Sequence, residues 1–389
     1  LLGHLFDIAL ERAYLRWQGP RAAPTTAQAL EQDLPGLTGA EHLAPLKAKL
    51  DALRAGKRER VAIAQLGASH TAAHFFTDEA RRRLSATYGG RGRGYVAAGR
   101  ASKRFPANEV QRELTGAWKV LDAIQDATPG DPSGLARIWG ANGIRAVLDG
   151  GASSTWRYCT GCDGAGVTSR LMLHYLETPD MGRLEVLLDG KPVTLPAGGA
   201  AAGVRARVAT WEAPGAEHTL EVRNLGPGSV TLFGASSEQL RPGIVYDSLG
   251  LPTATVFNLA SFDRPTFVSQ LEALSPDLVV LFYGTNESVL TDFDHERHAQ
   301  AYAEVFARLR EAKPDVACVF VGPTDRMDEQ PDGSWKPSVA SDQVIASLRR
   351  VAREQRCALW SARAEMGGEG SIAKWLTATP RLAHPDHIH

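Results

Sequence analysis

Short apolar runs that alternate with helix-like stretches limit what this chain of 389 residues can fold into. The runs have the length and composition of buried strands, and they lie at 61–66, 244–249, 278–284, 316–322 and 357–361. Between them, apolar side chains recur at helical spacing in 71–84, 266–274, 298–312 and 340–355. Strands that alternate with helices indicate a parallel sheet covered by helices on both faces. The predicted fold class is therefore α/β, with a doubly wound parallel sheet.

The middle of the chain, residues 116–236, does not follow this alternation. It carries short β-type runs at 171–176, 184–188, 204–211 and 218–222, and Asp189-Gly190 is typical of a hairpin turn. Several short strands at this spacing predict an all-β sandwich inserted into the α/β domain. The expected organisation is a helical N-terminal segment (1–58), a first part of the α/β domain (59–115), the inserted sandwich (116–236) and a second part (237–389).

The charge and hydropathy of the chain argue against several classes of partner. The formal net charge is −1 and no long basic run is present, so the sequence offers no electrostatic reason to bind nucleic acid or an anionic membrane. No stretch approaches the roughly eighteen consecutive apolar residues of a membrane span. The start at Leu1 shows no signal-peptide cleavage pattern, so we expect a mature or trimmed chain with sequence missing at both ends.

The chain has four cysteines, too few for a disulfide framework at this length, and we expect it to fold without disulfide or metal staples. Cys159 and Cys162 have the spacing of a redox centre or half a zinc site, but a structural or incidental role is favoured because no strand-then-helix setting surrounds them. Cys318 and Cys357 are interpreted as core strand residues. A local disulfide would indicate an oxidising compartment.

Ser69 follows a predicted strand and opens a predicted helix, within Gly67-Ala68-Ser69-His70. Open α/β sheets bind ligands here, beyond the carboxyl ends of their strands. The serine N–H lies near the positive end of the helix, where it suits a developing oxyanion. On its own, a serine at this place is more often a helix N-cap. His70 is interpreted as a wall of the site rather than a base.

Two further polar motifs follow. Phe282-Tyr283-Gly284-Thr285-Asn286-Glu287 ends another predicted strand, where the Asn286 amide can donate to the same oxyanion, although an Asx turn is an equal alternative. The chain ends in His384-Pro385-Asp386-His387-Ile388-His389. An aspartate three residues before a histidine can orient the imidazole that accepts the serine proton. A metal clip and a solvated tail are the other interpretations of this ending.

In this order, the motifs resemble those of the SGNH (GDSL-like) hydrolase family, whose blocks read Gly-Asp-Ser, Gly-x-Asn-Asp/Glu and Asp-x-x-His. They stand here as Gly67-Ala68-Ser69, Gly284-Thr285-Asn286-Glu287 and Asp386-His387-Ile388-His389. The stretch from Trp360 to Trp375 resembles peptidoglycan O-acetylesterases of the Ape type, which also carry an inserted carbohydrate-binding-like sandwich. The resemblance implies a flavodoxin-like three-layer fold.

Two positions depart from the family pattern. Ala68 stands where the family has an aspartate that helps to organise the loop of the nucleophile. Thr253 aligns with the glycine of the second block, and it keeps an N–H to donate. If the loop needs a positive φ at this position, threonine is unfavourable there. Both changes point to a weakened esterase.

The resemblance implies a serine esterase that removes O-acetyl groups from peptidoglycan or another acetylated polysaccharide, outside the cytoplasm (periplasmic or secreted), without a cofactor or a metal. The roles that it implies are Ser69 as nucleophile, Asp386 and His389 as acid and base, Ser69, Thr253 and Asn286 as oxyanion donors, and His70, Gly284 and Thr285 as substrate-binding residues.

Other classes stay open at this point. A non-catalytic glycan-binding protein is favoured by the changes at Ala68 and Thr253, but not by the retained Ser69 and Asn286. An esterase or lipase for another acyl substrate would use the same triad, although no long apolar lid segment is present. A metal-dependent deacetylase rests on the terminal histidines and aspartate alone.

Overall fold

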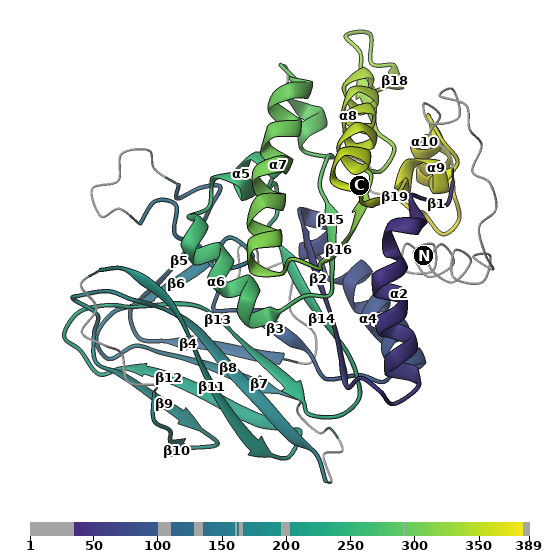
Figure 1. Ribbon diagram of the computed structural model, residues 1–389. Coiled ribbons are helices and arrows are strands. Elements are labelled where there is room, and N and C mark those ends of the chain that lie inside the picture. Colours follow the sequence, from purple (N-terminus) through teal and green to yellow (C-terminus); the bar gives the residue numbers. More distant parts are fainter. Residues whose placement is uncertain are drawn as a thin grey trace.

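The computed structural model describes residues 35–99, 110–127, 135–159, 162, 166–195, 203–290 and 292–383 (Figure 1). A central sheet with helices on both sides adjoins a β-sandwich, which Figure 1 shows at the lower left. The α/β class with an inserted β domain, expected from the sequence, is therefore confirmed. Among the described residues, no helix has the length and apolar character needed to cross a membrane.

The central sheet has the strand order of a flavodoxin-like fold. Its six strands run β1-β19-β16-β15-β2-β14, and every pair except β1–β19 is parallel. In chain order the parallel strands are β2 (Arg60–Gly67), β14 (Gly243–Gly250), β15 (Leu278–Phe282), β16 (Ala317–Val321) and β19 (Ala358–Trp360). The spatial order of these strands is thus 2-1-3-4-5, and it reverses between β2 and β15. This reversal is where ligands bind in such sheets.

Helices cover the two faces of the sheet. On one face, α2 (Ala44–Arg54) and α4 (Phe75–Tyr88) bury Leu46, Leu53 and Phe76 against the strands. The other face carries α5 (Val256–Ser261), α6 (Arg264–Leu274), α7 (His295–Ala312) and α8 (Val339–Gln355). The short helices are η2 (Ala40–Leu43), α3 (Ser69–Ala72), η3 (Glu287–Val289), α9 (Ala362–Met366) and α10 (Ser371–Thr377).

Two helical expectations need correction. The segment 1–58 was expected to be helical, but β1 (Leu37–Thr38) within it pairs antiparallel with β19. The single helix expected over 71–84 is broken into α3 and α4, because His74 between them has a left-handed backbone (φ 65°). Residues 1–34 lie outside the described part of the chain.

The sandwich consists of two antiparallel sheets, with the orders β10-β9-β12-β7-β4 and β11-β8-β13-β6-β5. Its strands are β3 (Gly94–Ala97), β4 (Val110–Thr115), β5 (Trp118–Asp122), β6 (Ile144–Leu148), β7 (Ser153–Tyr158), β8 (Thr168–Glu177), β9 (Leu184–Leu188), β10 (Lys191–Pro192), β11 (Arg205–Pro214), β12 (His218–Asn224) and β13 (Val230–Gln239). The hairpin expected at Asp189-Gly190 joins β9 to β10, with positive φ at both residues.

The sandwich extends beyond the boundaries of 116 and 236 that the sequence suggested. Strand β3 pairs with β13, and β4 pairs with β7, so sandwich strands begin at Gly94. Strand β13 continues to Gln239, three residues past the expected end. All residues of β3 and β13 are buried, and this burial removes the polar alternation that marks a strand. Tyr95 on β3 packs into the core of the α/β domain, and Phe233 on β13 packs against Ile138.

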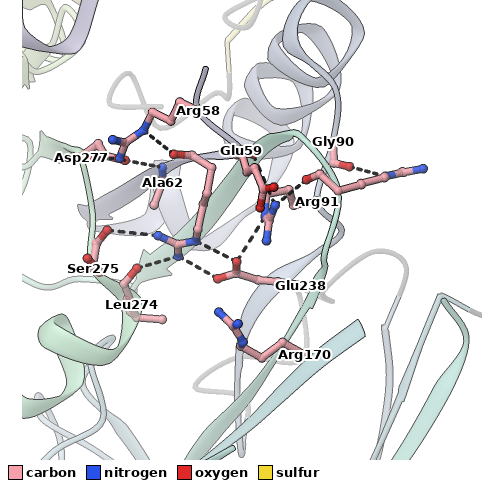
Figure 2. Close-up of polar contacts among 12 residues, drawn as sticks. Arg58, Glu59, Ala62, Gly90, Arg91, Arg170, Glu238, Leu274, Ser275 and Asp277 are labelled. Carbon is pink, nitrogen blue, oxygen red and sulfur yellow. Dashed lines mark hydrogen bonds and ion pairs between the residues drawn. The ribbon is translucent and has the colours of Figure 1, made fainter. Parts of the chain in front are cut away.

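A buried ion pair joins the two domains (Figure 2). Glu238 at the end of β13 accepts two hydrogen bonds from Arg60 at the start of β2, at 2.8 and 2.7 Å. Arg60 also donates to the carbonyls of Leu274 and Ser275 at the end of α6. Burial opposes ionisation of Glu238, but Arg60 and Arg91 outweigh it and hold the pKa of this carboxyl below its usual value.

Contrary to expectation, the four cysteines form two disulfides, Cys159–Cys162 and Cys318–Cys357. Cys318 lies on β16 and Cys357 immediately precedes β19, and these parallel neighbours bring the two Cα atoms to 4.9 Å. The sequence hides this pairing because the two residues are 39 positions apart. Disulfides persist in oxidising compartments.

Candidate functional site

Three loops meet at the carboxyl edge of the central sheet. Gly67 at the end of β2 is in register with Gly250 at the end of β14 on one side and with Phe282 at the end of β15 on the other. The loops that follow these strands carry Ser69, Thr253 and Asn286. The three loops therefore start side by side at the point where the strand order reverses.

Ser69 is the first residue of α3, and glycines let this short helix approach the sheet. A Cβ added at Gly67 would lie 2.2 Å from the Thr71 Oγ1 atom, and one at Gly250 would lie 2.2 Å from the Ala72 nitrogen. The Ala68 N–H donates to the carbonyl of Phe282 at 3.3 Å. A larger residue at either glycine would push α3, and Ser69 with it, away from the strand ends.

Hydrogen bonds from buried polar side chains of β2 and β14 hold α3 in place. The Tyr246 hydroxyl on β14 donates to the Gln65 side chain on β2. Gln65 in turn donates to Thr71 Oγ1 at 2.9 Å, and Ser248 donates to the Thr71 carbonyl at 3.0 Å. Because burial makes an unmade hydrogen bond costly, these contacts fix the direction of α3. No sequence motif indicates this support.

Asn286 and Glu287, in the loop after β15, hold this loop against the loop after β14. The Asn286 Nδ2 atom donates to the carbonyl of Ala254 at 2.8 Å. Glu287, which is fully buried, accepts from the N–H of Val256 at 2.7 Å and from the N–H of Gly284 at 2.8 Å. Burial raises the pKa of the Glu287 carboxyl to about 7. The Asn286 amide has a second N–H, which suits donation to an oxyanion.

Thr253 has a backbone conformation that favours glycine. Its φ is 61°, and its hydroxyl donates to the carbonyl of Pro252 at 2.7 Å. A non-glycine residue in this left-handed region costs about 1–2 kcal/mol. The positive φ that was suspected at this position is therefore present.

The remaining expected substrate-binding residues surround this edge of the sheet. The half-buried His70 ring stacks on Phe282, with 5.1 Å between ring centroids and an interplanar angle of 17°. Gly284 has a φ of 117°, which suits glycine. Thr285 is buried, and its carbonyl accepts from the Ser288 hydroxyl.

The chain returns to this edge near its C-terminus. Asp325, in the loop after β16, accepts from the Ile372 N–H in the first turn of α10, and burial raises the pKa of its carboxyl. Trp375 on the same helix donates to the Met366 carbonyl. Asp386 and His389 lie outside the described residues.

Comparison with known proteins supports the family resemblance. The model of the GDSL-like lipase/acylhydrolase family matches residues 208–388. A solved structure described as "Peptidoglycan O-acetylesterase in action, 5 min" superposes with a TM-score of 0.75 at 24% identity, and the match covers 91% of this chain and 93% of that chain. This structural likeness extends through both the α/β domain and the sandwich. No curated protein sequence matches the chain.

More distant solved structures include two further carbohydrate esterases. An acetyl xylan esterase is 19% identical, with a TM-score of 0.28 over 38% of this chain and 72% of that chain. A family two carbohydrate esterase from Clostridium thermocellum is 12% identical, with a TM-score of 0.22 over 61% of this chain and 84% of that chain. These TM-scores are too low to support an inference.

Proposed function

We propose that this chain, a carboxylic ester hydrolase of the GDSL-like type, removes O-acetyl groups from a polysaccharide, with O-acetylated peptidoglycan as its substrate. One observation carries the proposal: the loops bearing Ser69, Thr253 and Asn286 meet where the strand order of the sheet reverses. The choice of peptidoglycan is supported by the similarity to a peptidoglycan O-acetylesterase across both domains.

In the proposed mechanism, the Ser69 Oγ atom attacks the carbonyl carbon of the acetyl ester, and His389 takes the serine proton while Asp386 orients the imidazole. The tetrahedral oxyanion accepts hydrogen bonds from the Ser69 N–H, the Thr253 N–H and the Asn286 amide. The sugar hydroxyl leaves with a proton from His389. Water then attacks the acetyl-enzyme, which releases acetate and restores Ser69.

Two features indicate that the proposed activity is weakened. Ala68 is buried and supplies no carboxylate to the loop of the nucleophile. Thr253 strains the loop that presents an oxyanion donor. Loss of one oxyanion donor lowers kcat by about a hundredfold to a thousandfold. A glycan-binding protein without catalysis is the second candidate, and these same two positions are the observations that favour it.

We also propose that the protein acts outside the cytoplasm, in the periplasm or as a secreted protein. A polysaccharide of the cell wall is accessible there. The Cys159–Cys162 and Cys318–Cys357 disulfides support an oxidising compartment.

The test measures acetate release from O-acetylated peptidoglycan and from p-nitrophenyl acetate. The parent chain and the Ser69→Ala variant are compared in two forms each, one with Ala68 unchanged and one with Ala68→Asp. Ser153→Ala, on the sandwich strand β7, is the matched control because it removes a serine hydroxyl far along the chain from the site.

We expect acetate release that Ser69→Ala abolishes, that Ala68→Asp increases and that Ser153→Ala leaves unchanged. If no acetate release depends on Ser69 in either background, esterase activity is excluded and the glycan-binding candidate replaces it. Activity on p-nitrophenyl acetate without activity on peptidoglycan would instead reject the proposed substrate.

A further inference from the structure

We propose that Phe75 is a stacking platform for a sugar ring of the substrate, and that it gives the enzyme a preference for polymeric over small esters. This inference rests on the proposed function, since it assigns a glycan subsite next to the proposed nucleophile. Neither the family motifs nor the predicted site residues include Phe75.

Phe75 is unusually exposed for an aromatic residue. It is 84% exposed, more than any other large apolar side chain in the described part of the chain, where Val339 is next at 70%. Single exposed apolar residues need no explanation in general, but a whole phenyl ring presented to water is uncommon. The contacts of its two neighbours hold the backbone at this position in place.

The next residue anchors Phe75 beside the nucleophile. Phe76 is buried and packs edge-on against Phe282, with 5.8 Å between ring centroids. The ring of Phe282 also stacks with His70, and the carbonyl of Phe282 accepts a hydrogen bond from the Ala68 N–H. The start of α4 is therefore attached to the strand end that also supports the loop of Ser69.

The preceding residue, His74, sets the turn by which the chain enters α4 just before the two phenylalanines. His74 has a left-handed backbone (φ 65°), which is unfavourable for a residue other than glycine. Its Nδ1 atom lies 3.1 Å from the Nη2 atom of Arg93, a buried residue that also lies 3.8 Å from Asp78. Burial and the charge of Arg93 lower the pKa of His74 to about 4, so the ring is neutral and accepts this hydrogen bond.

This turn is strained, and it is held by a buried arginine. Backbone strain of this kind persists where the surrounding structure enforces it, and it is concentrated at functional sites. The turn sets the direction in which α4 begins, and because consecutive residues of a helix point about 100° apart, Phe76 enters the core while Phe75 faces water. The chain length between Ser69 and Phe75 limits their separation to about 20 Å, and the four helical residues of α3 shorten it further.

A sugar ring is the occupant that this environment fits. The phenyl face is flat and apolar, and a pyranose presents an equally flat face of C–H groups between its hydroxyls. The neighbouring Asp78 is paired with Arg81 and Arg93, so it offers no isolated charge that would recognise an ionic ligand. A polymer that places its acetyl group at Ser69 has further sugar rings within reach of Phe75, whereas p-nitrophenyl acetate has no sugar ring to stack there.

The experiment compares Phe75→Ala, Phe75→Leu and Phe75→Trp. Leucine keeps apolar surface without a flat ring, and tryptophan keeps the ring. Val339→Ala is the matched control, because Val339 is also highly exposed but lies at the start of α8. For each variant, kcat and KM are measured on O-acetylated peptidoglycan and on p-nitrophenyl acetate. Binding to intact peptidoglycan is measured by depletion in a Ser69→Ala background.

We expect Phe75→Ala and Phe75→Leu to raise KM and the dissociation constant for peptidoglycan by about two- to twelvefold, the range expected for loss of one aromatic contact. Phe75→Trp should stay within about twofold of the parent chain, as should Val339→Ala and all kinetics on p-nitrophenyl acetate. Because the Phe75 side chain is exposed, its replacement removes no core packing. A rise in KM on peptidoglycan alone is therefore not explained by a folding defect.

Unchanged KM and binding in Phe75→Ala would overturn the inference, and so would an equal loss on both substrates. Such a result, with acetate release that still depends on Ser69, leaves the proposed function standing. If no variant releases acetate, the proposed function fails, and the binding measurement alone decides: weaker binding by Phe75→Ala supports the platform, and unchanged binding rejects it.

Discussion

The left-handed backbone of Thr253 allows a quantitative test of strain in the loop that we propose donates to the oxyanion. Replacing Thr253 with Gly removes the strain of about 1–2 kcal/mol that a side chain suffers in this conformation. The same change increases the freedom of the unfolded chain, which costs about 0.4–1 kcal/mol. It also removes the hydrogen bond from the Thr253 hydroxyl to the Pro252 carbonyl.

A comparison of Thr253→Gly with Thr253→Ala isolates the backbone effect, because both variants lack the hydroxyl. We expect the Gly variant to be more stable than the Ala variant by about 0.5–1 kcal/mol. Thr87 is the control: it is exposed on α4, where glycine should instead be less stable than alanine by up to about 1 kcal/mol.

Free energies of unfolding from urea titrations of the four variants provide the measurement. The sign of the Gly-minus-Ala difference should be opposite at the two positions. If Thr253→Ala is as stable as Thr253→Gly, the loop does not hold a left-handed residue at this position, and the explanation of a strained oxyanion loop is wrong. Acetate release by Thr253→Gly, compared with the parent chain, then shows whether relief of the strain also improves the chemistry.

Three further predictions concern Glu287, the domain junction and the disulfide. Burial raises the pKa of Glu287 from 4.5 to about 7, so folding favours the protonated carboxyl. As the pH rises from 4.5 to 7, the free energy of unfolding of the parent chain should therefore fall by up to about 3 kcal/mol relative to that of Glu287→Gln. Urea unfolding at a series of pH values measures this difference. A pH-independent difference would contradict this. Glu238→Gln should destabilise the chain by about 3 kcal/mol at pH 7 because Arg60 loses its charged partner. Since the pKa of Glu238 is lowered on folding, that difference should shrink as the pH falls below about 4.5, and a constant difference would refute the ion pair. Replacing both Cys318 and Cys357 with serine should cost about 2–4 kcal/mol, and thiol titration of the unfolded parent chain without reductant should find no free thiol.

Much of the central sheet could be predicted because its signals are local. The apolar runs at 61–66, 244–249 and 278–284 became β2, β14 and β15, and the helical stretch 298–312 lies within α7. Each run combines strand length with apolar composition, and the helix repeats its apolar residues at the helical period. The hairpin at Asp189-Gly190 was predictable for the same reason, because its turn residues carry their own conformational preference.

Features that depend on tertiary contacts could not be predicted in the same way. Glu287 reads as part of a loop motif, but its partner Val256 is 31 residues away, and only the fold brings the two together. The pairing of Cys318 with Cys357 depends likewise on the adjacency of β16 and β19. The break at His74 depends on Arg93, which reaches it from beyond α4. No local pattern encodes such contacts.

The sequence indicates which residues form the candidate site more clearly than it indicates how they are arranged. Ser69 and Asn286 each follow an apolar run, and parallel strands place such loops at one edge of the sheet. The positive φ of Thr253 could be suspected only from the glycine that the family has at this position. Asp386 and His389, which lie outside the described residues, remain predictions from their motif.

Covalent labelling identifies a nucleophilic serine, and in the proposed mechanism that serine is Ser69. The chain would be treated with a serine-directed sulfonyl fluoride, followed by peptide mass spectrometry and an assay of acetate release. We expect a single modified serine, Ser69, and a loss of acetate release in proportion to the fraction labelled. Full acetate release from chains quantitatively labelled at Ser69, or inactivation with the label on a different serine, would contradict the proposed mechanism.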